Sequence, residues 1–231
     1  MNFPYSIIDL THDLSSLSPS WDGACGFQCH NVIDYQDCGI NLPFRVQRLN
    51  MQAGIGTHLD APAHCVEGGK TVAELDLNDL LAPAVVINVS QKANSEYKIV
   101  REDIINFETK YGQIKTHSFV IIYTGWDRYW QEPEKYHNNY KFPFLAQEAA
   151  ELLLARKVVG LGTDTLSPDR PDTGYPVHKL FLEAGKYLIE NVANAAKLPA
   201  VGSYILALPL KILQGTEAPL RLVALMNKEE K

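Results

Sequence analysis

Three residues with metal-binding side chains stand close together in the segment 54–64, which reads GIGTHLDAPAH. They are His58, Asp60 and His64. Pro62 disfavours a helix here, because an interior proline removes a hydrogen bond and clashes with the preceding turn. In an extended strand alternate side chains share a face, so all three would point toward one place. Two imidazoles and a carboxylate at one place predict a site for a divalent metal such as Zn²⁺ or Mn²⁺.

The alternative is that these are two surface histidines and a turn aspartate beside a loop. The whole chain has only seven histidines, so two of them with an aspartate in one short segment favour the metal site. Gly54 and Gly56 precede the group and would allow a close approach of the backbone.

Two further candidate ligands come later in the chain. His178 stands at the start of an expected helical turn, and Glu190 lies in the otherwise apolar stretch 187–192. A buried carboxylate in such a strand is costly unless a metal or a histidine compensates its charge. A place on a solvent-exposed edge would explain Glu190 equally well, so the sequence leaves both open.

The four cysteines offer a weaker alternative metal site. Cys25, Cys29 and His30 are close in sequence, but the paired C-x-x-C spacing typical of zinc sites is missing. We therefore expect reduced, packed thiols.

Composition points to an ordinary globular protein with no basic face. The 231 residues are 46% hydrophobic and 21% charged, with a net charge of -6, which fits one domain spanning 1–231 and gives no reason to expect a nucleic-acid partner. The sequence shows neither a bilayer-spanning apolar run nor a signal peptide at its start, so we expect no membrane partner and a cytoplasmic location.

Hydrophobic periodicity predicts the elements that would position these residues. Strands are expected at 6–11, 41–53, 83–89, 118–124, 157–163 and 187–192, with a closing pair at 204–212 and 220–226. Helices are expected at 71–80, 101–111, 144–157 and 177–184, with Ile104, Ile105 and Tyr111 on the apolar side of the second. The strand 41–53 is expected to run on into the segment 54–64. Strands and helices mix without strict alternation, which favours an α/β (mixed α+β) fold with a mixed sheet flanked by helices.

Several segments resemble the metal-dependent cyclase family, which includes bacterial kynurenine formamidases and isatin hydrolases. The run from Gly56 to His64 is similar to the family signature H-x-G-T-H-x-D-x-P-x-H. His178 and Glu190 stand twelve residues apart, as in the family pattern. Further similar segments follow in the family's order: IDLTH (8–12), WDG (21–23), YTGWD (123–127), GTDTLS (162–167), PVH (176–178) and LIENVAN (188–194).

The resemblance implies a single swivelling β/β/α domain assembled as a homodimer or homotetramer. It also implies hydrolysis, by metal-bound hydroxide, of an amide, lactam or lactone bond in a small, aromatic substrate. By analogy to the family's N-terminal loop, Trp21 and Phe27 would line an aromatic substrate-binding pocket, whereas the alternative for Trp21 is an anchor in the core or at an interface. Asp164 and Ser167, at the end of an expected strand, would either orient ligands or cap the turn.

The resemblance also implies the ligands. His58 and Asp60 match one metal position, whereas Asp60 (as a bridge), His64, His178 and Glu190 match a second. In single-metal relatives the residue matching His64 is an acid–base group. If His64 binds metal here, Glu190 or a water would have to carry the catalytic proton.

The chain departs from the signature at Gly54, where the first histidine would stand. Glycine offers no side-chain ligand, and Gln52, on the same strand parity, is a poor substitute for imidazole. The chain would then hold one ion in the second position, hold one through a rearranged set, or hold none. We expect the first: one zinc or manganese ion per chain. Two other classes stay open, a catalytically degenerate member that binds a small metabolite and a cyclase or dehydratase.

Overall fold

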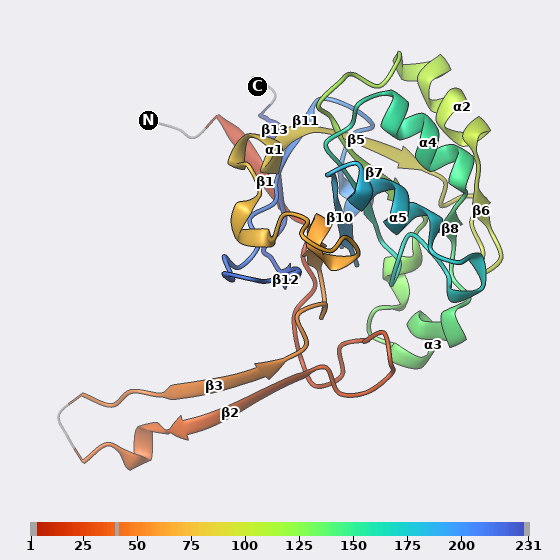
Figure 1. Ribbon diagram of the computed structural model, residues 1–231. Coiled ribbons are helices and arrows are strands. Elements are labelled where there is room, and N and C mark those ends of the chain that lie inside the picture. Colours follow the sequence, from red (N-terminus) through yellow and green to blue (C-terminus); the bar gives the residue numbers. More distant parts are fainter. Residues whose placement is uncertain (1–3, 40–41, 229–231) are drawn as a thin grey trace.

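Strands from both ends of the chain form one large mixed sheet (Figure 1). The computed structural model describes residues 4–39 and 42–228. In chain order the strands of this sheet are β1 (Tyr5–Asp9), β4 (His58–Asp60), β5 (Leu81–Asn88), β7 (Phe119–Tyr123), β9 (Gly160–Thr163), β10 (Tyr187–Glu190), β11 (Ser203–Leu206), β12 (Glu217–Pro219) and β13 (Val223–Asn227). Across the sheet their order is β1-β13-β11-β5-β7-β9-β10-β4-β12. This confirms the mixed α+β fold.

The central strands β5, β7, β9 and β10 run parallel, and those toward both edges pair antiparallel. Parallel strands are covered on both faces, which is why β5 and β7 are almost wholly apolar. Adjacent residues of β7 pack on opposite faces of the sheet: Ile121 belongs to the hydrophobic core on one face and Val120 to the core on the other. The helices α2 (Arg101–Tyr111), α4 (Gln147–Ala155) and α5 (Pro176–Glu183) cover the Val120 face (Figure 1).

The helices largely follow the expected ranges. The short helical segment becomes a 3₁₀ turn, Val72–Glu74, and α1 (Leu77–Leu80), while α3 (Pro133–His137) was not expected. The helix α2 has the predicted bounds, but Ile105 and Tyr111 are 41% and 43% exposed, which corrects their assignment to the apolar side. Ile105 lies about 100° around the helix from buried Ile104, so both cannot face the sheet.

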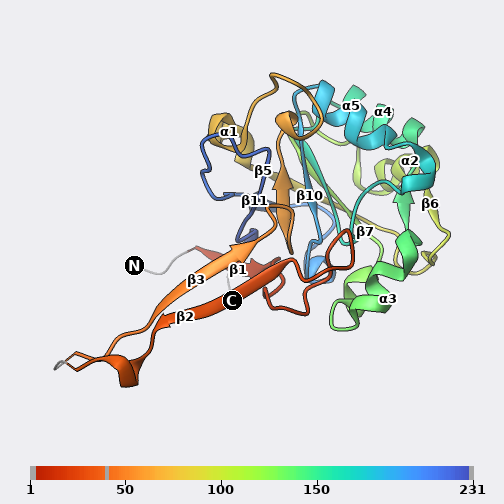
Figure 2. The same ribbon diagram turned by 60° about the horizontal axis from the view of Figure 1, so that its bottom comes forward.

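A second pair of strands projects from the body as an arm (Figures 1 and 2). The arm consists of β2 (Phe27–Ile33) and β3 (Val46–Met51), which pair antiparallel. The expected strand 41–53 is therefore shorter, and its first residue, Asn41, lies outside the described residues. It also does not run on into 54–64, because a turn at 53–54 separates β3 from β4. The strand β2 was not predicted.

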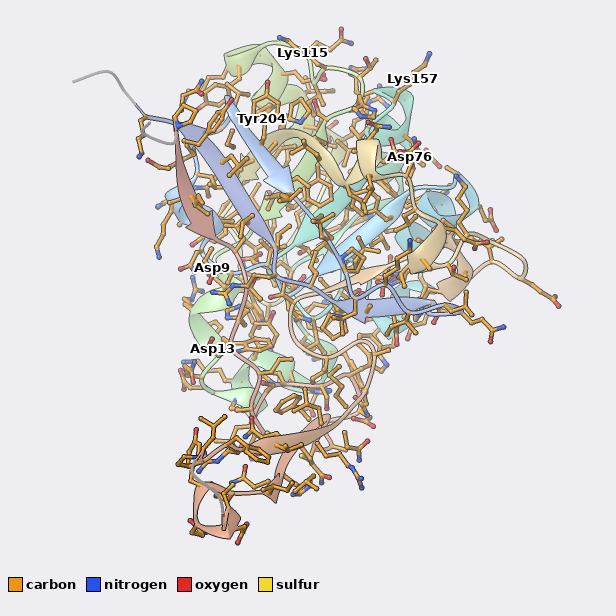
Figure 3. All side chains as sticks on the ribbon, turned by 90° about the vertical axis from the view of Figure 1, so that its left-hand side faces the viewer. Asp9, Asp13, Asp76, Lys115, Lys157 and Tyr204 are labelled. Carbon is orange, nitrogen blue, oxygen red and sulfur yellow. The ribbon has the colours of Figure 1, made fainter. Side chains whose placement is uncertain are left out.

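Two more differences come from short pairings. The strands β6 (Lys98–Ile99) and β8 (Phe144–Leu145) pair, so the helix expected from Phe144 begins only at Gln147. The strands β11 and β13 pair as expected, but β11 ends at Leu206 instead of reaching residue 212, and β12, between them in sequence, was not predicted. Figure 3 views the edge of the sheet formed by β1, β13 and β11, with Tyr204 on β11 and Asp9 at the end of β1. No helix among the described residues could cross a membrane.

Candidate metal centre

The register of three neighbouring strands brings the predicted ligands together. In the antiparallel pair β4–β10, His58 lies opposite Glu190, and in the pair β4–β12, Asp60 lies opposite Glu217. Residues directly opposite each other share a face of the sheet, and His58 and Asp60 share one by alternation. Four side chains with ligand atoms therefore lie on one face.

Both histidines of this cluster are oriented by a bond to Nδ1. The Nδ1–H of His58 donates to the carbonyl oxygen of Gly56 (2.9 Å), and the Nδ1–H of His178, on α5, donates to the Asp169 carboxylate (2.8 Å). Each Nε2 is left facing the cluster. Imidazoles that bind metals are commonly oriented in this way. Asp169, which the sequence reasoning missed, also accepts from the backbone N–H of Val177 and His178, so it caps α5 as well.

The centre of the cluster is a buried aspartate without hydrogen-bond partners. Asp60 is 1% exposed, and neither carboxylate oxygen accepts a hydrogen bond. The Nε2 atoms of His58 and His178 lie 3.4 Å and 3.8 Å from it, longer than ordinary hydrogen bonds. An uncompensated buried carboxylate is costly, so the surroundings of Asp60 fit a cation.

Among the described residues, two groups have ligand atoms within 4.8 Å of one another. One contains His58, Asp60 and Glu217, and the other Asp60, His178 and Glu190. Asp60 belongs to both. Glu190 is 7% exposed, so it faces the cluster rather than solvent. Neither group includes a cysteine, and three cysteines (Cys25, Cys29 and Cys65) are exposed rather than packed as expected.

His64 occupies a different position from the one expected. It ends a 3₁₀ helix, Pro62–His64, instead of continuing β4, because Pro62 starts that turn. Its Nδ1–H donates to the Glu217 carboxylate (2.9 Å), and its side chain is 34% exposed. The two ligand groups above do not contain it, and its role as a ligand stays a prediction.

Charges in the cluster shift its ionisation. Burial opposes charge on His58, but the Asp60 and Glu190 carboxylates outweigh it and raise the pKa of this imidazole. Burial also opposes charge on His178, but the hydrogen bond to Asp169 and the nearby Glu190 carboxylate raise its pKa. Burial favours neutral Glu190, but the two imidazoles lower its pKa to about 2. The excess of carboxylates thus attracts positive charge, from protons or from a metal ion.

A cavity of about 550 Å³ opens onto this cluster. Trp21 and Tyr175 form aromatic parts of its wall, with ring centroids 6.2 Å apart. Tyr175 adopts the left-handed conformation (φ 59°), which is uncommon for a bulky residue and occurs at functional sites. Phe27 begins β2 and is not one of the described residues lining the cavity, so its substrate contact stays a prediction.

The two polar residues after β9 support the backbone. The Asp164 carboxylate accepts from the N–H groups of Thr124 and Trp126 and so holds the turn after β7. The hydroxyl of Ser167 accepts from the N–H of Asp169 (3.2 Å). Asp164 thus caps a turn, and Ser167 fixes the loop that carries Asp169.

The sequence and the fold match known proteins over nearly the whole chain. The family described as "Putative cyclase" matches residues 8–170. The chain belongs to this cyclase family.

The relatives of this cyclase-family protein carry the names of hydrolytic enzymes. An isatin hydrolase of Roseibium aggregatum is 29% identical, over 96% of this chain and 87% of that protein. A kynurenine formamidase of Geobacillus thermodenitrificans is also 29% identical, over 93% and 94%. The crystal structure of an isatin hydrolase bound to the product analogue thioisatinate superposes with a TM-score of 0.88 at 27% identity, over 97% and 94%. The cyclase-family chain is a hydrolase.

Proposed function

We propose that this protein is a metal-dependent hydrolase that opens an amide or lactam C–N bond, or a lactone C–O bond, in a small aromatic substrate. The observation that carries the proposal is the Asp60 carboxylate, buried without partners between imidazoles whose Nε2 atoms face it. The names of the relatives, isatin hydrolase and kynurenine formamidase, support the bond type.

The ion is a divalent metal, with zinc or manganese as the proposed identity, because imidazole and carboxylate donors suit both. Asp60, His178 and Glu190 would hold it. Bound there, it would polarise a carbonyl oxygen and lower the pKa of a water molecule. Asp169 fixes His178, so the donor set is largely preorganised.

His64 is the proposed proton donor to the leaving group. It lines the cavity, is partly exposed, and has its Nε2 free of the bond that Nδ1 makes to Glu217. The bond to Glu217 raises the pKa of His64, which increases its protonated fraction near neutral pH. Glu190 is the second catalytic candidate, because its carboxylate also lines the cavity, but with a pKa of about 2 it is ionised near neutral pH and would accept a proton rather than donate one.

The aromatic wall indicates the substrate class. A cavity of about 550 Å³ is large enough for a bicyclic aromatic molecule. The backbone carbonyl of Trp21 accepts from Tyr140 (2.7 Å) and His137 (3.0 Å), and its ring packs on Tyr140 with centroids 4.7 Å apart, so the ring offers a supported surface for stacking.

The test is hydrolysis of a panel containing an aryl formamide, isatin as a lactam, an aromatic lactone and an aromatic ester. We expect the metal-loaded protein to cleave the formamide or the lactam and to lose that activity after chelation. His64→Gln should reduce kcat by about 10²–10⁴-fold at unchanged metal content. A protein that binds aromatic ligands but cleaves none of the four would instead be a non-catalytic binding protein.

We also propose a homo-oligomer, with the arm packed on a second copy. A two-stranded hairpin alone is marginally stable in water. Exposed apolar side chains gather on the two strands of this arm and on the segment between them, which is typical of an interaction surface. They are Val32, Tyr35, Leu42, Phe44, Val46 and Leu49.

We further propose that residues 1–231 act as one domain in the cytoplasm. Pairing of β1 with β13 joins the two ends of the chain in one sheet, which supports a single domain. The exposed, unpaired thiols of Cys25, Cys29 and Cys65 support a reducing compartment.

A further inference from the structure

The first metal position of the family signature loses a ligand at Gly54, but the structure fills the same space from another strand. A Cβ atom built on Gly54 would lie 3.3 Å from each of three atoms of Glu217, its Cδ, Oε1 and Oε2. The Glu217 carboxylate therefore lies in tight contact with the place of a Cβ at position 54, in the space that a larger side chain there would have to enter. Glycine at this position leaves room for it.

The register of β12 places this carboxylate beside the remaining ligands. Glu217 lies directly opposite Asp60 in the antiparallel pair, and His58 is on the same face of β4. Ligand atoms of these three residues lie within 4.8 Å of one another. His58, Asp60 and Glu217 thus form a complete three-residue group without residue 54.

The charges at this place favour a cation over an empty site. Two carboxylates directly opposite each other in a sheet repel and destabilise the pair. One of them, Asp60, is 1% exposed and neither of its oxygens accepts a hydrogen bond. A divalent ion between Asp60 and Glu217 would remove the repulsion and compensate the buried charge.

We propose that Glu217 replaces the signature histidine missing at Gly54, so that His58, Asp60 and Glu217 hold a second divalent ion beside the one held by Asp60, His178 and Glu190. The inference rests on the proposed function and deepens it. It revises the expectation of one ion per chain, which was based only on the missing ligand at Gly54. Asp60 belongs to both groups and would contribute to both positions.

A second role for Glu217 must be separated from ligation. Its Oε2 accepts the bond from His64 Nδ1–H (2.9 Å), so Glu217 could act only by orienting that imidazole. Glu217→Gln distinguishes the two roles. A glutamine carbonyl can still accept from His64, whereas a neutral amide is a much weaker ligand for zinc or manganese.

The experiment measures bound metal per chain in the full-length protein, equilibrated with Zn²⁺ or Mn²⁺ and freed of excess ion. We expect about two ions in the wild type and about one in Glu217→Gln. The double variant Gly54→His/Glu217→Ala, which exchanges the two ligand positions, should return to about two, because removing the carboxylate makes room for an imidazole. Glu183→Ala, at an exposed glutamate of α5, is the control and should keep the wild-type value.

The outcomes separate this inference from the proposed function. One ion in both the wild type and Glu217→Gln would overturn the role of Glu217 and leave the metal-dependent hydrolase standing. No ion in the wild type under any loading condition would overturn both. Two ions in Glu217→Gln would show that Glu217 only orients His64. Thermal unfolding of each variant establishes that a lost ion does not reflect a lost fold.

Discussion

At the scale of single residues, the site depends on side chains that would not themselves touch a metal. Asp169 is fully buried, bonds His178 Nδ1 at 2.8 Å and thereby determines where Nε2 points. Asp60 differs, since none of its neighbours donates a hydrogen bond to its carboxylate. The chemistry of the centre therefore resides as much in the orienting contacts as in the ligands.

Replacing Asp169 by asparagine should weaken metal binding. The amide can still cap α5, but it removes the charge that fixes and polarises the His178 ring, so we expect affinity to fall about 10–100-fold. Titration with a competing chelator would measure this. Asp172→Asn, which alters the ion pair between the exposed Asp172 carboxylate and the buried Arg170, is the control. Equal affinities in the two variants would contradict the role of Asp169.

His12 should make stability depend on pH. Burial lowers its pKa to about 4, and its ring stacks on Trp130 at 4.0 Å with Nε2 unpartnered. The unfolded chain, with a histidine pKa near 6.5, binds the proton first, so the stability contributed by neutral His12 is present above about pH 6.5 and is lost as the pH falls toward 4.

The measurement is urea unfolding at several pH values between 7.5 and 4. His12→Phe keeps an aromatic ring against Trp130 but cannot titrate. We expect the free energy of unfolding of the wild type to fall by about 1–3 kcal/mol more than that of the variant across this range. Parallel curves for the two proteins would exclude His12 as the source.

At the scale of elements, position in the fold separates residues that look alike in sequence. Ile104 and Ile105 are adjacent on α2, yet the first is fully buried and the second 41% exposed. Ile104→Ala should therefore lower the free energy of unfolding by about 2–4 kcal/mol, whereas Ile105→Ala should cost under about 1 kcal/mol. Chemical denaturation of both variants would measure the difference. Similar losses would mean that α2 packs with another face on the sheet.

At the scale of the whole molecule, the arm projects from the body (Figure 2). It carries exposed apolar side chains that the rest of the chain does not cover. The strand β1 is an edge of the large sheet and pairs with β13, and an ion pair between Arg221 and Asp9 (2.6 Å) ties the segment before β13 to β1. Among the described residues β2 and β3 pair only with each other, which supports the proposal that a second copy packs on the arm.

Shortening the arm should dissociate the assembly and leave the body folded. Residues 31–47 can be replaced by Asn-Gly, a two-residue hairpin turn, because His30 and Arg48 are cross-strand partners. We expect light scattering to show an oligomer for the wild type and a monomer for the shortened chain, with similar thermal unfolding of the body. A monomeric wild type, or an unchanged mass after shortening, would contradict the proposed interface.

The sequence alone predicted most of the candidate centre and determined most of the sheet. Apolar stretches predicted the strands β5, β7, β9 and β10 because parallel, doubly covered strands are continuously apolar. The spacing of His58 and Asp60 predicted a shared face because alternation in a strand is local geometry. The cyclase resemblance then identified His178 and Glu190, which are far from β4 in sequence.

Only the tertiary structure decided the rest, because it depends on which strands become neighbours. Glu217 stands on a three-residue strand with no periodicity to reveal it, and only its register opposite Asp60 brings it to the site. Gly54, which in sequence signifies a missing ligand, in space makes room for that carboxylate. His64 left the predicted strand because a 3₁₀ turn intervened. Local sequence fixes which way a side chain points along its own strand, whereas long-range pairing fixes what it meets there.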